Sequence, residues 1–187
     1  MGSITPIDAT LKVLLDKLLE APTWKLKVLG MQTLFEGMAV GIMDQVHRSS
    51  FNPLVQQMLR RVHQDEARHA AFGVLSMRRI VQESTPEEMA EMEDFAFNIL
   101  ETLNANQQLD MLRLFGPKYN LDPDNVVQMM HGSEVWPSIN SEVFMHTVMP
   151  NLKRLGLVTE RTEQKYRDRG ILWGDQSNIQ RSLPTDG

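Results

Sequence analysis

Cysteine is absent from the 187-residue chain, and this absence excludes several kinds of site at once. There can be no disulfide framework, no thiolate metal site and no cysteine nucleophile. Without thiolates, a structural zinc site is also disfavoured. The absence suits a cytoplasmic protein, because disulfides belong to oxidising compartments.

Basic runs and long apolar runs are missing as well. The net charge is −5 at pH 7, which argues against nucleic acid as the main partner. No uninterrupted apolar run approaches the ~20 residues that a membrane-spanning helix needs, and no signal-peptide pattern occurs. We therefore expect neither a nucleic-acid partner nor a membrane partner.

Strand periodicity is the third absence, since no stretch alternates apolar and polar residues over a strand length. Apolar spacing at three and four residues, with Pro and Gly at the breaks, predicts helices near 7–20, 24–47, 53–82, 86–115, 123–130, 138–155 and 159–169. Thr85-Pro86-Glu87-Glu88 is a capping box, and Asn52-Pro53 begins the preceding long helix. We predict an all-α fold of the helical-bundle type, with one domain over 1–172 and a mobile tail over 173–187.

Three polar residues fall on helix faces that should be buried. Glu66 and His69 are three residues apart, so they share a face that the apolar pattern predicts to point inward. Glu36 poses the same problem on the preceding helix, and two antiparallel helices joined by a short turn would bring it level with Glu66. A buried carboxylate beside a buried imidazole needs a partner, and a divalent metal, a carboxylate–histidine hydrogen bond or an arginine would each supply one.

A Glu on one helix and a Glu-x-x-His on the next form half of a known two-metal site, in which four helices supply two of each. GMQTLFEGMAV and HQDEARHAAFG resemble the C-terminal half of the ferritin-like di-iron carboxylate proteins. That superfamily includes rubrerythrins, the small subunit of ribonucleotide reductase and di-iron N-oxygenases. FMHTVMPNLKRLGLVTE is similar to the tail of longer members, so the resemblance covers most of the chain.

The resemblance implies a ferritin-like bundle with Glu36, Glu66 and His69 as ligands of iron, or of manganese. Asp65, the acid before the Glu-x-x-His, would hydrogen-bond a metal-bound histidine, and Arg68 would pair with carboxylates. His63 is a candidate extra ligand, as in some N-oxygenase sites. Glu142 and His146, four apart on a later helix, are weaker candidates.

The chain departs from the family pattern because a second Glu-x-x-His is missing. A symmetric homodimer would rebuild the four-helix site from two copies. Alternatively, the chain is a fragment of a longer protein, or a partner supplies the other half. In a third reading, Glu66, His69, Arg68 and Asp65 satisfy one another without metal in a helical interaction protein.

With metal, we expect an oxidase or oxygenase that activates oxygen toward a small organic substrate, because thirteen methionines suggest an adaptable pocket. Iron storage or peroxide removal is the alternative metal function. The substrate is not identified by the sequence.

Overall fold

The computed structural model describes residues 9–115, 120–131 and 141–172 of the chain. These residues are mostly helical and include no strand, which confirms the all-α prediction. The predicted tail over 173–187 lies outside the described residues.

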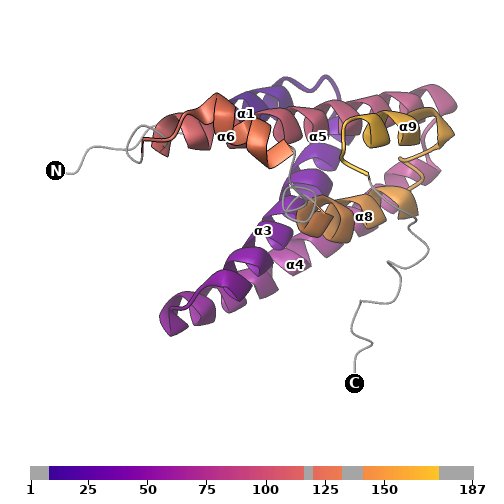
Figure 1. Ribbon diagram of the computed structural model, residues 1–187. Helices are drawn as coiled ribbons and strands as arrows, with labels where there is room; N and C mark the ends of the chain where they lie inside the picture. Colours follow the sequence, from indigo (N-terminus) through magenta and orange to yellow (C-terminus); the bar gives the residue numbers. More distant parts are fainter. Residues whose placement is uncertain (1–8, 116–119, 132–140, 173–187) are drawn as a thin grey trace.

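The elements follow one another along the chain with short connections (Figure 1). They are α1 (Ala9–Glu20), α2 (Trp24–Val28), the π-helix η1 (Leu29–Phe35), α3 (Glu36–Ser49), α4 (Pro53–Gln82), α5 (Pro86–Phe115), α6 (Pro123–His131), the π-helix η3 (Ser141–Val148), α8 (Met149–Arg154) and α9 (Glu160–Asp168).

The caps of the two longest helices are those that the sequence predicts. Asn52 Oδ1 accepts from the backbone N–H groups of Leu54 and Val55, and Pro53 is the first residue of α4. At the start of α5, the backbone N–H of Glu88 donates to Thr85 Oγ1, and Glu88 Oε2 accepts from the Thr85 N–H at 3.0 Å. Each side chain satisfies a backbone donor that the helix itself leaves unpaired.

One predicted helix differs in its interior. The sequence predicts a single helix from Trp24 to about His47, but the structure inserts η1 between α2 and α3. The N–H of Glu36 donates to the carbonyl of Met31, five residues earlier instead of four. Such π-turns change the direction in which the following side chains point and occur often at functional sites.

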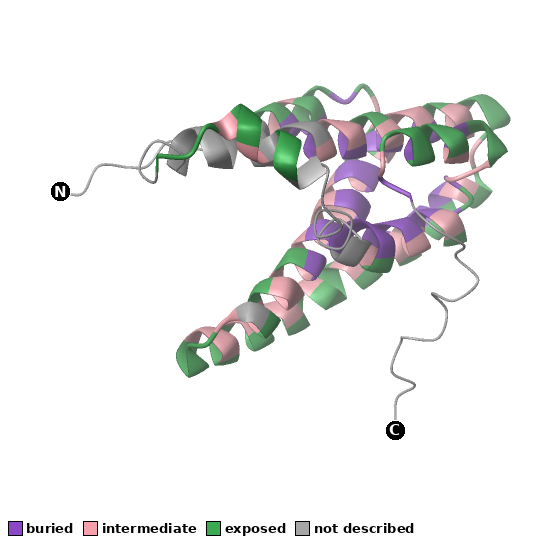
Figure 2. Cartoon of the chain, viewed as in Figure 1, coloured by how far each residue is buried: buried purple, intermediate pink, exposed green. Residues whose placement is uncertain are grey.

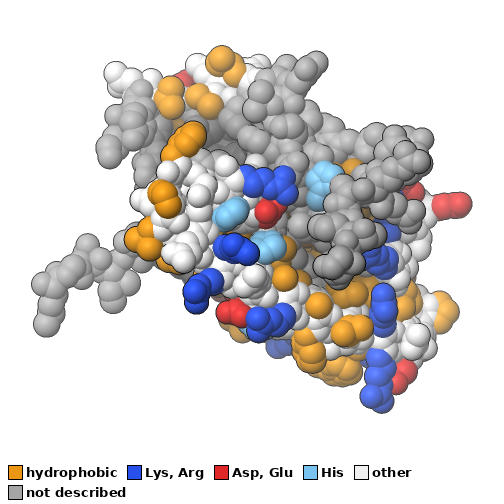
Figure 3. Space-filling view, turned by 90° about the horizontal axis from the view of Figure 1, so that it is seen from below, with side chains coloured by type: hydrophobic (Ala, Val, Ile, Leu, Met, Phe, Trp, Pro, Cys, Tyr) orange, Lys and Arg blue, Asp and Glu red, His pale blue; other side chains and the backbone are white. Residues whose placement is uncertain are grey.

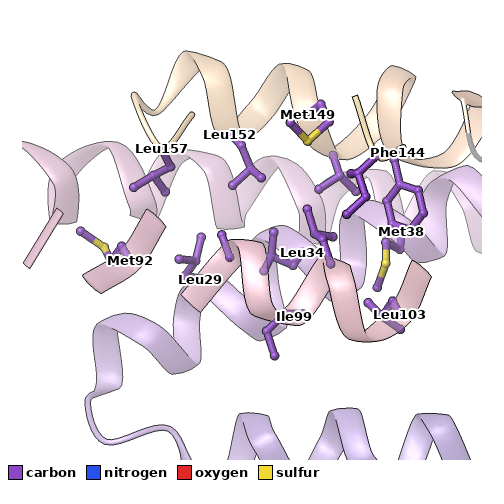
Figure 4. Packing of buried hydrophobic residues seen from close by; sticks show 14 of the residues in the cluster. Leu29, Leu34, Met38, Met92, Ile99, Leu103, Phe144, Met149, Leu152 and Leu157 are labelled. Carbon is purple, nitrogen blue, oxygen red and sulfur yellow. The ribbon is translucent and has the colours of Figure 1, made fainter. Parts of the chain in front are cut away.

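The run from η1 into α3 lies at the centre of the packed core (Figure 4). Leu29, Leu34 and Met38 come from this run. On one side they face residues of α5, including Met92, Ile99 and Leu103, and on the other they face Phe144, Met149, Leu152 and Leu157 from η3, α8 and the segment that follows. Burial of these side chains is the main source of stability.

The antiparallel pair α3–α4 extends away from this core as a two-helix arm (Figure 1). The buried residues of α4 are Gly73, Met77 and Ile80, all in its C-terminal third. Half-buried and exposed residues prevail toward the tip of the arm (Figure 2). The first two thirds of α4 therefore contact little besides α3.

The continuous helical run Trp24–Arg48 is, by length and composition alone, apolar enough to cross a membrane. This finding differs from the expectation, drawn from the lack of a long uninterrupted apolar run, that the chain has no segment able to span a membrane. The core helix of a globular protein meets the same criterion, and 44% of the run's most apolar window is buried inside the protein.

Candidate metal centre

The structure brings together the three residues that the sequence singles out as metal ligands. One ligand atom from each of Glu36, Glu66 and His69 lies within 4.8 Å of the other two. Glu66 Oε2 is 3.2 Å from Nδ1 of His69. Two carboxylate oxygens and one imidazole nitrogen at this spacing form a donor set that suits Fe(II) or Mn(II).

Two features of the backbone set this spacing. Glu36 is the first residue of α3, directly after η1, and the hairpin turn near Phe51 places it level with Glu66. Farther along α4, Gly73 lies against the backbone of η1, and a Cβ there would be only 2.6 Å from the carbonyl carbon of Gln32. The absence of a side chain at Gly73 therefore allows α4 to approach η1 closely.

The two glutamates perturb each other's pKa in opposite directions. Partial burial, followed by the hydrogen bond with Glu66 and its negative charge, raises the pKa of Glu36 above the ordinary 4.5. The hydrogen bond from Glu36 lowers the pKa of Glu66, and the hydrogen bond and charge of His69 act in the same direction. The opposite shifts reflect the close approach of the two carboxylates, and a cation bound between them would relieve their mutual repulsion.

The prediction that Glu66 and His69 point into a buried interior is wrong for the chain described here. The Glu66 side chain is 23% exposed and that of His69 is 60% exposed. Figure 3 shows histidine, basic and acidic side chains gathered in one region of the surface, with hydrophobic side chains nearby. Among the described residues, no further helix covers this part of the arm. We call this surface of α3 and α4, beside Glu36, Glu66 and His69, the open face.

The other predicted site residues lie around the triad but outside it. Asp65 and Arg68 are exposed and pair with each other, with Oδ1 of Asp65 3.3 Å from Nη1 of Arg68. His63 is half-buried, and the structure does not bring it into the group of donors. His146 is exposed on η3, and the side chain of Glu142 lies outside the described residues.

The two surface hollows described below are lined neither by methionine nor by residues of the triad. Met38, Met77, Met92, Met145 and Met149 are buried in the core. Two surface hollows occur elsewhere. One is formed by Trp24, Phe72, Leu75, Ser76, Arg79, Ile80 and Glu83, and the other by Asp94, Phe97, Asn98, Lys165, Asp168 and Arg169.

The sequence analysis did not single out Glu93, which is the most deeply buried carboxylate among the described residues. Its Oε2 accepts hydrogen bonds from Thr159 Oγ1 at 2.8 Å and from Arg161 Nη2 at 3.1 Å. These contacts attach α9 to α5 across a long sequence separation. All of them come from the chain itself, so we assign Glu93 a structural role.

Comparison of the chain with protein-family models, with curated proteins and with solved structures returns no match.

Proposed function

We propose that the chain contributes one half of a carboxylate-bridged two-metal centre, with Glu36, Glu66 and His69 as ligands. The observation that carries the proposal is the placement of these three donors within 4.8 Å of one another on two adjacent helices. The raised pKa of Glu36 supports it, because two carboxylates so close together favour a cation between them.

The donor set also supports the identity of the metal. Glutamate oxygens with a single imidazole suit iron or manganese, whereas the chain offers no thiolate for structural zinc. Two irons in such a centre supply oxygen or peroxide activation, and we propose an oxidase or oxygenase that acts on a small organic substrate. The substrate site would form when the open face of the arm is covered, and neither of the two hollows described above is lined by residues of the triad.

Each of the five candidate site residues has a defined part in this proposal. Glu36 and Glu66 would supply oxygen ligands, which bind a metal in their ionised form. His69 supplies the nitrogen ligand and already contacts Glu66 through Nδ1. Asp65 is one helical position from Glu66 and would orient a ligand histidine, while Arg68 neutralises Asp65.

The second candidate function is that of a metal-free helical interaction protein. It is favoured by the pairing of Glu66 with His69 and of Asp65 with Arg68, since each of these groups already has a partner. In that case the open face would serve protein binding alone.

Metal analysis after anaerobic Fe(II) reconstitution separates the two functions. The metal centre predicts about one iron per chain, which Glu66→Ala abolishes. Glu91→Ala, which removes an exposed carboxylate from α5, is the matched control and should keep the metal. A reconstituted protein without iron, or Glu66→Ala with unchanged iron, would rule out the metal centre and favour the interaction protein.

A further inference from the structure

Helix α4 carries an exposed stripe with coiled-coil spacing. Its members alternate at intervals of four and three residues: Leu54, Met58, Arg61, Asp65, Arg68, Phe72, Leu75 and Arg79. All are exposed, and the apolar ones strongly so, with Leu54 at 72%, Met58 at 56%, and Phe72 and Leu75 each at 62%. Alternating four-three spacing keeps residues on one side of a helix and is typical of a seam between helices. A stripe of this length with large apolar residues at both ends marks an interaction surface.

The stripe adjoins the metal-ligand triad through His69, the exposed member of the triad. Successive residues of a helix turn by about 100°, so His69 lies between the stripe and the side of α4 that faces α3. On α3, the exposed Ile42 and Val46 point away from η3, which packs against the opposite side at Gly37 and Gly41. A helix packed on the stripe would therefore lie beside His69, whereas Glu66 stays on the side of α4 that faces α3.

We propose that a second copy of this chain occupies this face, with the two α4 helices antiparallel about a two-fold axis. The charges of the stripe are self-complementary in that arrangement. When Asp65 lies opposite the partner's Arg68, symmetry places Arg68 opposite the partner's Asp65. The same register places Met58 against the partner's Leu75, and Phe72 against the partner's Arg61, where a cation–π contact forms.

The metal ligands select this register independently, a step that rests on the function proposed above. Pairing Asp65 with the partner's Arg68 puts the axis between positions 66 and 67, so the two Glu66 residues differ in height by about 1.5 Å. The two triads then lie at nearly the same height along the helices, and together they hold four carboxylates and two imidazoles. The other charge-matched register, Asp65 opposite the partner's Arg61, separates the two Glu66 residues by about 9 Å along the axis and breaks the site.

The size of the face is sufficient for a stable dimer. The 30 residues of α4 and the 14 residues of α3 are about 45 Å and 21 Å long, and each helix is about 10 Å wide. Together they offer roughly 650 Å², and stable interfaces bury about 600–1,000 Å² per partner.

Sedimentation equilibrium with charge reversal tests the interface. The wild type should have twice the 21.4 kDa mass of one chain. Asp65→Arg or Arg68→Asp alone should raise the dimer Kd at least about tenfold, because each places like charges opposite each other, and the double variant should restore it. Asp16→Arg, a matched reversal at an exposed acid on α1, should have no effect. A monomeric wild type, or single reversals that leave the dimer intact, would overturn the proposal.

Disulfide trapping tests the register. Because the chain has no native cysteine, only the introduced cysteines can form the cross-link. A Met58→Cys, Leu75→Cys double variant should form a covalent dimer on oxidation. Met58→Cys alone should not, because its two copies are about 25 Å apart in this register. Trapping by the single variant would refute the register. A dimer that passes both tests but binds no iron would leave the interface standing and refute only the metal function.

Discussion

Replacement of Gly73 by alanine tests how close packing of α4 against η1 builds the site. The added Cβ would lie 2.6 Å from the carbonyl carbon of Gln32 and even closer to its oxygen. Ordinary contact at this point requires a separation of about 3.4 Å, so α4 must move by close to 1 Å or the backbone of η1 must yield. Overpacking of this kind costs about 1–3 kcal/mol.

Gly37→Ala is the matched control because Gly37 is also a buried helical glycine. A Cβ there meets only Val148 Cγ2, at an ordinary 3.5 Å. Each replacement gains about 1 kcal/mol of helix propensity, so Gly73→Ala should end about 2 kcal/mol less stable than the control. For a chain of this length that difference lowers Tm by about 4–8 °C relative to the control in a thermal unfolding experiment.

The displacement of α4 should also change the spacing of the metal ligands, because Glu66 lies on the same helix two turns before Gly73. We expect Gly73→Ala to weaken Fe(II) binding and Gly37→Ala to leave it unchanged, as measured by titration of the apoprotein. If Gly73→Ala is as stable as the control, the helices have room to separate and the reasoning fails. Loss of stability with unchanged metal affinity would show that the spacing of α4 and η1 does not set the donor geometry.

Two further predictions concern charge. Because the folded protein raises the pKa of Glu36, this group stabilises the metal-free fold below the ordinary carboxyl pKa, and that stability is lost as pH rises through the raised value. Glu36→Gln should therefore remove this pH-dependent loss of unfolding free energy, as measured by urea unfolding between pH 4 and 8. The same variant should also abolish metal binding. An unchanged pH profile would contradict the assignment of the raised pKa to Glu36. Arg161→Ala should lower the free energy of unfolding by about 2 kcal/mol, because it removes a charged donor from buried Glu93, without changing metal binding. An unfolding midpoint equal to that of the wild type would show that α9 is held by other contacts.

Helix positions were predictable because their signals are local. Asn52-Pro53 and the Thr85 capping box each satisfy backbone donors within one turn, so the starts of α4 and α5 follow from a few residues. The π-helix η1 carries no comparable local signal, although its Leu29 and Leu34 belong to the buried core. The contact between Glu93 and Arg161 joins residues 68 positions apart, which local patterns do not report.

The proximity of Glu36, Glu66 and His69 was predictable from the hairpin alone, but the exposure of His69 was not. Helix periodicity identifies which side of α4 is apolar without stating what covers it. α4 has an apolar side that faces α3 and a stripe of exposed apolar and charged residues, and the described part of the chain buries residues only on the first. The inward orientation that the sequence predicts for His69 would therefore be correct only in an assembly that covers the stripe. The protection of the His69 ring on dimerisation therefore decides between a buried metal centre and an open polar cluster. It can be measured by NMR chemical shift or by hydrogen exchange at the C2 position of the ring.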